Sequence, residues 1–204
     1  MEHKNTAWIQ YGDEGNPIAV VLNCPGKTEY KKQCPAVGQT GKNLERLLKL
    51  LKASPSLEKD ARFFEKDYIE IVNASKIAHF ASARENGKDA APGKWKKSEV
   101  EKNVSFVKGR LLNTKIKHIL CFGAGAKLAI KLISKNLTSD EKKTFSKRKI
   151  LQCCHLSNQG IATPKSGYNW KTNERMTRLK EVADFIAENW GGQGISEFSR
   201  KKSC

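Results

Sequence analysis

Residues 18–51, IAVVLNCPGKTEYKKQCPAVGQTGKNLERLLKLL, decide the fold that the sequence predicts. The apolar run Ile18–Leu22 is typical of a buried strand, and it ends at a turn-forming Asn-Cys-Pro-Gly segment. A loop containing Gly38 and Gly41 follows. One apolar helix face is then formed by Leu44, Leu47, Leu48 and Leu51. In open α/β sheets such a loop lies at the carboxyl end of its strand, where ligands bind, so it is our candidate for the floor of an active site.

Strand and helix patterns alternate along the rest of the chain. Residues 68–72, 116–122 and 150–154 are apolar or β-branched runs and are predicted to be strands. Residues 97–112 and 176–190 carry apolar side chains at helical spacing. This alternation indicates an α/β fold, with a central, mostly parallel β-sheet covered by helices on both faces.

The length of the chain suits one domain. At 204 residues it can bury one substantial core, and a second full domain would be crowded. We therefore expect a single three-layer α/β/α domain over residues 1–190. Residues 191–204, GGQGISEFSRKKSC, are predicted to be a disordered basic tail.

The charge of the chain points to a polyanionic partner. Thirty-eight Lys and Arg residues against 21 Asp and Glu residues give a formal net charge of +17. Such an excess favours binding to nucleic acid, although solubility is the simpler alternative. No stretch approaches the roughly 20 apolar residues of a membrane-spanning helix, so we expect a nucleic acid rather than a membrane as partner. We expect the protein to act as a monomer.

The cysteines and the amino-terminal sequence bear on the compartment. The start, MEHKNTAWIQ, lacks the long apolar segment of a secretory signal, which favours the cytoplasm, where disulfides are rare. The six cysteines include no C-x-x-C pair, so no zinc site and no other metal is predicted. No cofactor is predicted either.

Three predicted strands end in polar residues suited to chemistry. Asn23 follows the first strand, Asn73 the second and His155 the last. Because the carboxyl ends of parallel strands lie at one edge of a sheet, these residues are expected to converge although they are far apart in the sequence.

The order and spacing of these segments resemble the uracil-DNA glycosylase superfamily, and its iron–sulfur branch in particular. Segment 22–26, LNCPG, resembles that branch's GEAPG motif, and segment 35–41, PAVGQTG, resembles its PFVGxAG motif. Segment 71–76, IVNASK, is similar to the TNVVK strand end, and 155–157, HLS, to the HPS-type histidine loop. The resemblance extends from about residue 18 to residue 190, and the ordered set is more specific than any one motif.

The chain departs from that branch at three points. The amino-terminal C-x-x-C is absent and Ile77 stands where a cluster cysteine would fall, so no iron–sulfur cluster is expected. Asn23 occupies the position of the motif carboxylate and cannot deprotonate water. Ala36 occupies the position of the aromatic residue that stacks on uracil, which opens space over the base.

The resemblance implies roles for the strand-end residues in base excision. Asn23 would hold a water near the anomeric carbon through its amide oxygen, the alternative being a loop-capping asparagine. Asn73 would pair with a pyrimidine edge, and otherwise is a turn residue. His155 would donate to the pyrimidine O2 as negative charge builds there, against the alternative of a structural histidine. Cys24 and Pro25, beside Asn23, complete the expected base-binding group with Ala36.

The partner that the resemblance implies is double-stranded DNA, and contacts to it are expected around the flipped nucleotide. Backbone groups of glycines and the hydroxyl of Ser157 would hold phosphates, lysines would supply charge, and Leu156 or a residue from Asn158 onward would enter the vacated base stack. The expected DNA-binding set is Gly26, Lys27, Gly38, Gly41, Lys42, Leu156, Ser157 and Asn158.

Three functions follow as hypotheses. The enlarged base site favours a monofunctional glycosylase that excises a bulky modified pyrimidine, such as the glucosylated cytosines of phage DNA, as anti-phage glycosylases of this superfamily do. Repair of uracil or deaminated bases is the second. The missing carboxylate supports the third, a catalytically silent nucleic-acid-binding protein on the same fold.

Overall fold

A computed structural model describes residues 6–13, 15–80, 90–91, 93–157 and 172–198 of the chain. Its main sheet has the strand order β1-β3-β2-β6-β7-β8. Neighbouring strands pair in parallel except at one edge, where β1 runs antiparallel to β3. The strands are β1 (Ile9–Gln10), β2 (Ile18–Leu22), β3 (Glu70–Asn73), β6 (His118–Phe122), β7 (Lys149–Cys153) and β8 (Gly194–Glu197).

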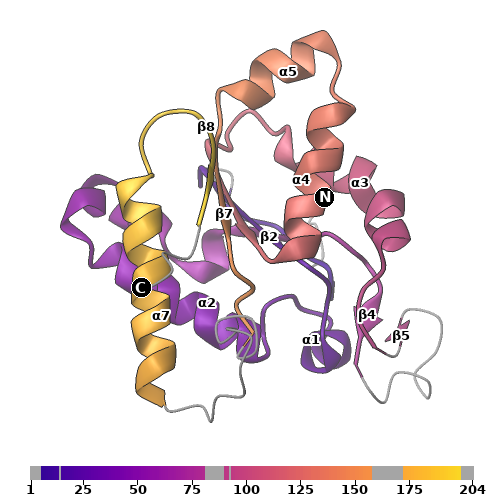
Figure 1. The fold of residues 1–204 in the computed structure, drawn as a ribbon, viewed down its shortest axis with the longest axis horizontal. Helices are drawn as coiled ribbons and strands as arrows, with labels where there is room; N and C mark the ends of the chain where they lie inside the picture. Colours follow the sequence, from indigo (N-terminus) through magenta and orange to yellow (C-terminus); the bar gives the residue numbers. More distant parts are fainter. Residues whose placement is uncertain (1–5, 14, 81–89, 92, 158–171, 199–204) are drawn as a thin grey trace, which may run out of the picture.

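Helices cover both faces of this sheet. Figure 1 shows α2 and α7 on one face, with α3 and α4 on the other. The α-helices are α1 (Lys27–Lys32), α2 (Gln39–Lys52), α3 (Lys97–Leu111), α4 (Ala124–Lys135), α5 (Ser139–Ser146) and α7 (Thr172–Glu188). Two 3₁₀ helices, η1 (Pro55–Phe63) and η2 (Lys66–Tyr68), connect α2 to β3. A separate pair of short parallel strands, β4 (Ala78–His79) and β5 (Ala90–Ala91), lies between β3 and α3.

The central strand β2 supplies side chains to both hydrophobic layers. Val20 and Leu22 belong to the core formed with α2 and α7, whereas Ala19 and Val21 belong to the core formed with α3 and α4. All five residues of β2 are buried because helices cover both faces, which explains why the strand reads as a continuous apolar run. The four leucines of the α2 face are also buried, and each such side chain contributes about 1.5–3 kcal/mol relative to an exposed one.

The predicted α/β architecture is confirmed, and each predicted strand and helix corresponds to one in the structure, with boundaries shifted by a few residues. The prediction of a disordered tail from residue 191 is wrong for part of that segment. Gly194–Glu197 forms β8, which pairs in parallel with β7 and extends the sheet. The backbone provides the pairing, since the β8 side chains are largely exposed and form no apolar pattern.

Candidate functional site

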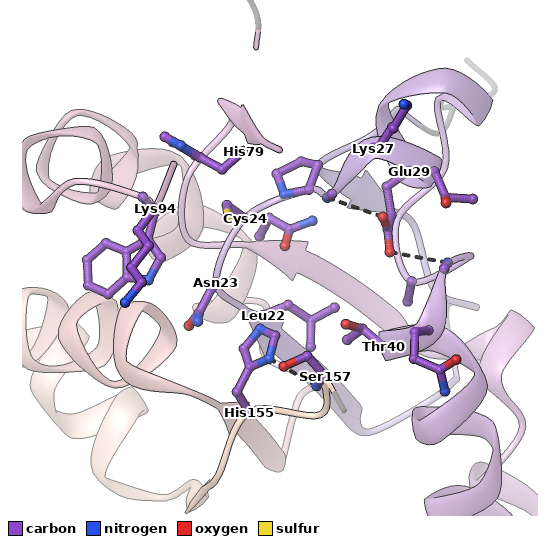
Figure 2. A pocket seen from close by; sticks show the side chains of 18 of the residues that line it. Leu22, Asn23, Cys24, Lys27, Glu29, Thr40, His79, Lys94, His155 and Ser157 are labelled. Atoms are coloured by element: carbon purple, nitrogen blue, oxygen red, sulfur yellow. Dashed lines mark hydrogen bonds between the residues drawn. The ribbon is translucent and has the colours of Figure 1, made fainter. Parts of the chain in front are cut away.

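A cavity of about 450 Å³ opens at the carboxyl ends of β2, β3 and β7. Its lining includes Asn23, Asn73 and His155, so the structure brings the three strand-end residues to one place. Figure 2 shows Asn23 and His155 in this cavity. The expected base-binding residues Ala36, Cys24 and Pro25 also line it. The other lining residues are Leu22, Gly26, Lys27, Thr28, Glu29, Gly38, Gln39, Thr40, His79, Gly93, Lys94, Trp95 and Ser157.

His155 is held as a neutral donor. Its Nδ1 accepts a hydrogen bond of 3.0 Å from the backbone N–H of Ser157, so Nδ1 carries the lone pair and the proton lies on Nε2. Burial lowers the pKa of His155 below its usual range, which favours this neutral form. A neutral imidazole with a fixed N–H suits donation to an oxygen that becomes negative during a reaction.

Asn23 does not present its amide oxygen to the cavity as expected. Its Oδ1 accepts hydrogen bonds of 2.9 Å and 3.2 Å from the backbone N–H groups of Gly125 and Ala126, in the first turn of α4. These bonds satisfy two of the N–H groups that a helix start leaves unpaired. The predicted positioning of water through this oxygen is therefore wrong for this structure, and the capping alternative describes the residue.

Glycines make room for this contact. Gly123 has φ +95°, and a Cβ there would lie 2.8 Å from both amide atoms of Asn23 and from His155 Cδ2. A Cβ on Gly125 would lie 3.0 Å from Asn23 Oδ1 and 3.3 Å from Trp95 Cε2. The absence of side chains at these positions lets β6, α4 and the His155 loop approach one another closely.

Asn73 is almost completely buried, at 1% exposure, and is oriented by one hydrogen bond. Its Nδ2 donates to the backbone oxygen of Ala7 at 3.3 Å, whereas its Oδ1 has no hydrogen-bond partner in the described part of the chain. The backbone oxygen of Asn73 accepts from Asn103 Nδ2 at 3.1 Å, which anchors the strand end to α3. A buried amide oxygen without a partner is unfavourable in the free protein and suits a ligand that supplies a donor.

Glu29 organises the loop after β2. Its two carboxylate oxygens accept from the backbone N–H groups of Gly26 and Gly38, each at 3.2 Å (Figure 2). The prediction that the backbones of these glycines bind phosphate is therefore wrong for their N–H groups, which are bonded within the protein. No role was predicted from the sequence for Glu29, which lies between the two motif segments 22–26 and 35–41.

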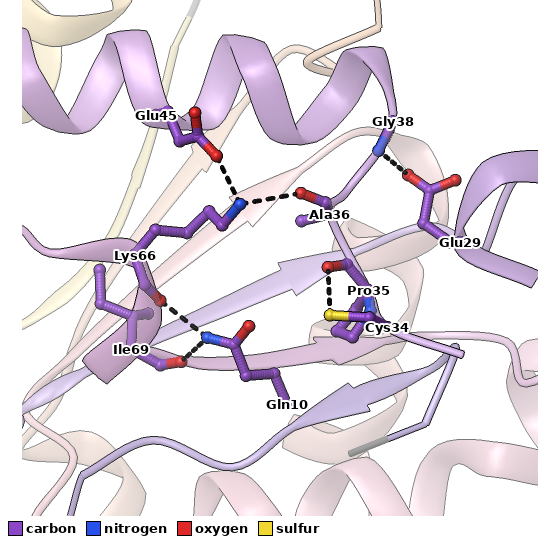
Figure 3. A network of polar contacts seen from close by, with 9 residues as sticks. All are labelled: Gln10, Glu29, Cys34, Pro35, Ala36, Gly38, Glu45, Lys66 and Ile69. Atoms are coloured by element: carbon purple, nitrogen blue, oxygen red, sulfur yellow. Dashed lines mark hydrogen bonds and ion pairs between the residues drawn. The ribbon is translucent and has the colours of Figure 1, made fainter. Parts of the chain in front are cut away.

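Ala36 lies in the same loop in an unusual backbone conformation. Its φ is +52°, and its carbonyl oxygen accepts from Lys66 Nζ at 3.3 Å (Figure 3). A Cβ on Gly41 would lie 1.5 Å from that oxygen, so α2 can begin against the loop only with glycine here. Gly41 is buried and has this packing role rather than the predicted contact with DNA.

Only some of the remaining predicted DNA-binding residues lie at the cavity. Leu156 is fully buried in the core, and its carbonyl oxygen accepts from Asn43 Nδ2 at 2.7 Å, so the prediction that Leu156 enters the base stack is wrong. Lys27 and Ser157 line the cavity. Lys42 is exposed on α2 and is not among the lining residues. Asn158 lies outside the described residues.

The pairing of His79, a lining residue, with the carboxylate of Glu99 was not predicted from the sequence. His79 Nε2 lies 2.8 Å from Glu99 Oε2, and the side chains are 2% and 10% exposed. Glu99 Oε2 also accepts from Ser75 Oγ at 3.4 Å and from the backbone N–H of Lys96 at 3.1 Å. His79 Nδ1 is buried and has no partner among the described residues. No sequence pattern links a histidine on β4 to a glutamate 20 residues later.

Cys24 stays a protonated thiol. Burial, together with the negative charges of Glu99 and Glu29, raises its pKa to about 12. A thiol of this kind is a poor nucleophile, so the cysteine beside Asn23 acts as a lining residue. Its neighbour Pro25 is buried, and the Pro25 carbonyl oxygen accepts from the backbone N–H of His79 at 2.9 Å.

Comparisons with known proteins add no identification. No protein-family model matches the chain, and a search of curated proteins finds no similar sequence. Within the described ranges, no three His, Cys, Asp or Glu side chains are grouped so that they could hold a metal ion. None of the described helices is long and apolar enough to cross a membrane. The resemblance to glycosylases thus stays a prediction that rests on motif order.

Proposed function

We propose that this protein is a DNA glycosylase that hydrolyses the N-glycosidic bond of a flipped-out, bulky modified pyrimidine and leaves an abasic site. A glucosylated hydroxymethylcytosine of the kind found in phage DNA is the substrate we favour. One observation carries the proposal: a single cavity is lined by a fixed donor, His155 Nε2–H, and by Asn73, whose Oδ1 has no partner among the described residues. These are the two kinds of group needed to grip the edges of a pyrimidine.

The reaction places negative charge on the base and positive charge on the sugar. His155 donates Nε2–H to the pyrimidine O2 as the glycosidic bond breaks, which stabilises the departing base. Asn73 accepts through Oδ1 from the cytosine amino group or from a uracil N3–H. Asn23 contributes by fixing the start of α4 beside the cavity rather than by binding water.

The size and lining of the cavity support a substituted base. Ala36 places little side-chain volume where an aromatic residue would cover a plain pyrimidine. Thr28, Thr40 and Lys94 add hydroxyl and ammonium groups to the lining. Such groups can bond the hydroxyls of a sugar attached to the base.

The positive charge of the chain supports DNA as the molecule that contains the modified base. Lys27 and Lys94 line the cavity and are exposed, so they can contact phosphates beside a flipped nucleotide. For duplex DNA each neutralised phosphate steepens the salt dependence of binding by roughly 0.9 log units per decade of salt.

The test is incubation with duplexes that contain uracil, unmodified cytosine, hydroxymethylcytosine or glucosylated hydroxymethylcytosine, followed by alkali to reveal abasic sites. We expect strand breaks in the glucosylated duplex. Breaks in the uracil duplex alone would reject the bulky substrate and favour uracil repair.

A catalytically silent DNA-binding protein is the second candidate, favoured by the bonding of Asn23 Oδ1 within the protein. Duplex binding without abasic sites in any of the four DNAs would support it over the enzyme.

A further inference from the structure

The hydrogen bonds of Glu99 determine which nitrogen of His79 carries the proton. Glu99 Oε2 accepts hydrogen bonds from the Ser75 hydroxyl and the Lys96 backbone N–H, and it also lies within hydrogen-bond distance of the His79 ring. The carboxylate therefore acts as an acceptor only. It stands in the first turn of α3, where the same oxygen closes the start of the helix by accepting from the Lys96 N–H. His79 must therefore donate Nε2–H to Glu99, which leaves the lone pair of the neutral ring on Nδ1.

Backbone contacts hold His79 against the loop after β2. The His79 N–H donates to the Pro25 carbonyl oxygen at 2.9 Å, and β4 pairs with β5 through His79 and Ala91. His79 lines the cavity that holds Asn23 and His155, yet its Nδ1 has no partner in the described part of the protein. A buried, oriented and unused proton acceptor at such a site is unfavourable unless a ligand engages it.

The other groups that could take a proton in the cavity are already engaged. His155 is committed as a donor, because its Nδ1 accepts from the Ser157 N–H. Both oxygens of Glu29 bond backbone N–H groups of the loop. Cys24 is a protonated thiol, and Asn23 is an amide whose oxygen is bonded to α4. His79 is the remaining histidine of the lining.

We propose that His79 is the general base that accepts a proton from the attacking water, and that Glu99 is the residue that positions it. The inference rests on the proposed glycosylase function and deepens it. As the water oxygen bonds to the anomeric carbon, one water proton moves to His79 Nδ1 and the glycosidic electron pair leaves with the base. The imidazolium that forms is stabilised by Glu99, and its proton later passes to the base anion or to solvent.

The experiment measures single-turnover formation of abasic sites, together with duplex affinity, in three variants. His79→Ala removes the base and leaves space for a small molecule. Glu99→Gln keeps His79 but removes the charge behind it. His118→Ala is the matched control, because His118 is a half-buried histidine stacked on Trp190 and is not in the cavity lining.

We expect His79→Ala to slow the reaction by roughly 100-fold or more, the usual contribution of a general base, without loss of duplex affinity. Added imidazole should restore part of that rate, which a purely structural role would not allow. Glu99→Gln should slow the reaction by about 10-fold, and His118→Ala should react as the wild type does.

Two results would overturn the role of His79. One is a His79→Ala variant as fast as wild type. The other is a Glu99→Gln variant at the wild-type rate, together with a His79→Ala variant that is slow and unresponsive to imidazole. If His79→Ala does not fold, the Glu99→Gln rate decides alone. A wild-type protein that attacks none of the four duplexes refutes the glycosylase itself, which is a distinguishable outcome.

Discussion

The loop after β2 and the segments after β3 and β7 use their polar groups in opposite ways. In the loop, Asn23 Oδ1 is bonded to α4, both oxygens of Glu29 are bonded to glycine N–H groups, and the Ala36 carbonyl is bonded to Lys66. At the end of β3 and in the segment that follows it, Asn73 Oδ1 and His79 Nδ1 have no partner among the described residues. After β7, His155 keeps Nε2–H while Nδ1 is bonded.

The difference separates two groups of residues. The bonded groups of the loop after β2 form a frame, and Asn73, His79 and His155 form a reactive side. Groups already bonded within the protein hold the geometry of the cavity, and groups without partners remain for a ligand. The loop with the most motif-like sequence is therefore the frame, and we assign the chemistry to the segments that follow the other two strands. Substitutions on the reactive side should therefore lower the rate of base excision, and substitutions in the frame should lower the stability of the protein.

The largest effect is expected on the reactive side. His155→Ala should reduce the single-turnover rate of base excision by about 100- to 1,000-fold, as loss of one fixed donor to a developing oxyanion does. Duplex affinity, measured by gel shift, should stay near that of the wild type. Equal loss of affinity and rate would mean that His155 supports the structure of the cavity and does not act on the base.

A smaller effect, of a different kind, is expected for the frame. Glu29→Ala leaves the N–H groups of Gly26 and Gly38 without their acceptor, so the free energy of unfolding in urea should fall by about 1–3 kcal/mol. Glu101→Ala is the control, because Glu101 is half exposed and pairs with the exposed Lys97 on α3, where ion pairs contribute about 0–1 kcal/mol. If the two variants are equally stable, the Glu29 bonds do not support the loop.

The smallest effect concerns pH and a histidine outside the cavity. Burial lowers the pKa of His118 below the ordinary value of 6.5, as it does for His155. The unfolded chain therefore binds protons more readily than the folded protein, so stability should decline as pH falls below about 6.5. His118→Phe keeps a ring beside Trp190 and removes one of these groups. Its urea-unfolding free energy should vary less with pH than that of the wild type, and an unchanged slope would contradict the assignment.

Much of the fold follows from local sequence patterns. Continuous apolar runs predict β2 and β6 because both faces of each strand are covered, and the leucine stripe of α2 predicts its packing. Strand β8 escapes this reasoning because GISE carries one exposed Ile and no apolar face. Its stability derives from backbone pairing with β7, which side-chain patterns do not reveal.

The site was predictable in position but only partly in function. Their positions at the ends of predicted parallel strands indicate that Asn23, Asn73 and His155 share an edge of the sheet. The bonding of Asn23 to α4 depends on residues more than 100 positions away, and its oxygen was for that reason misassigned. The HLS segment predicted the position of His155, but the sequence does not show that Leu156 turns into the core. The contact between His79 and Glu99 likewise exists only in three dimensions.

The pairing of β8 with β7 affects how the protein can be shortened or fused. A version that stops at Trp190 would remove an outer strand and bare the backbone donors and acceptors of β7. Exposed strand edges recruit other chains, so such a truncation should aggregate during expression. An affinity tag or a fluorescent partner is better attached beyond residue 198, where this edge remains covered.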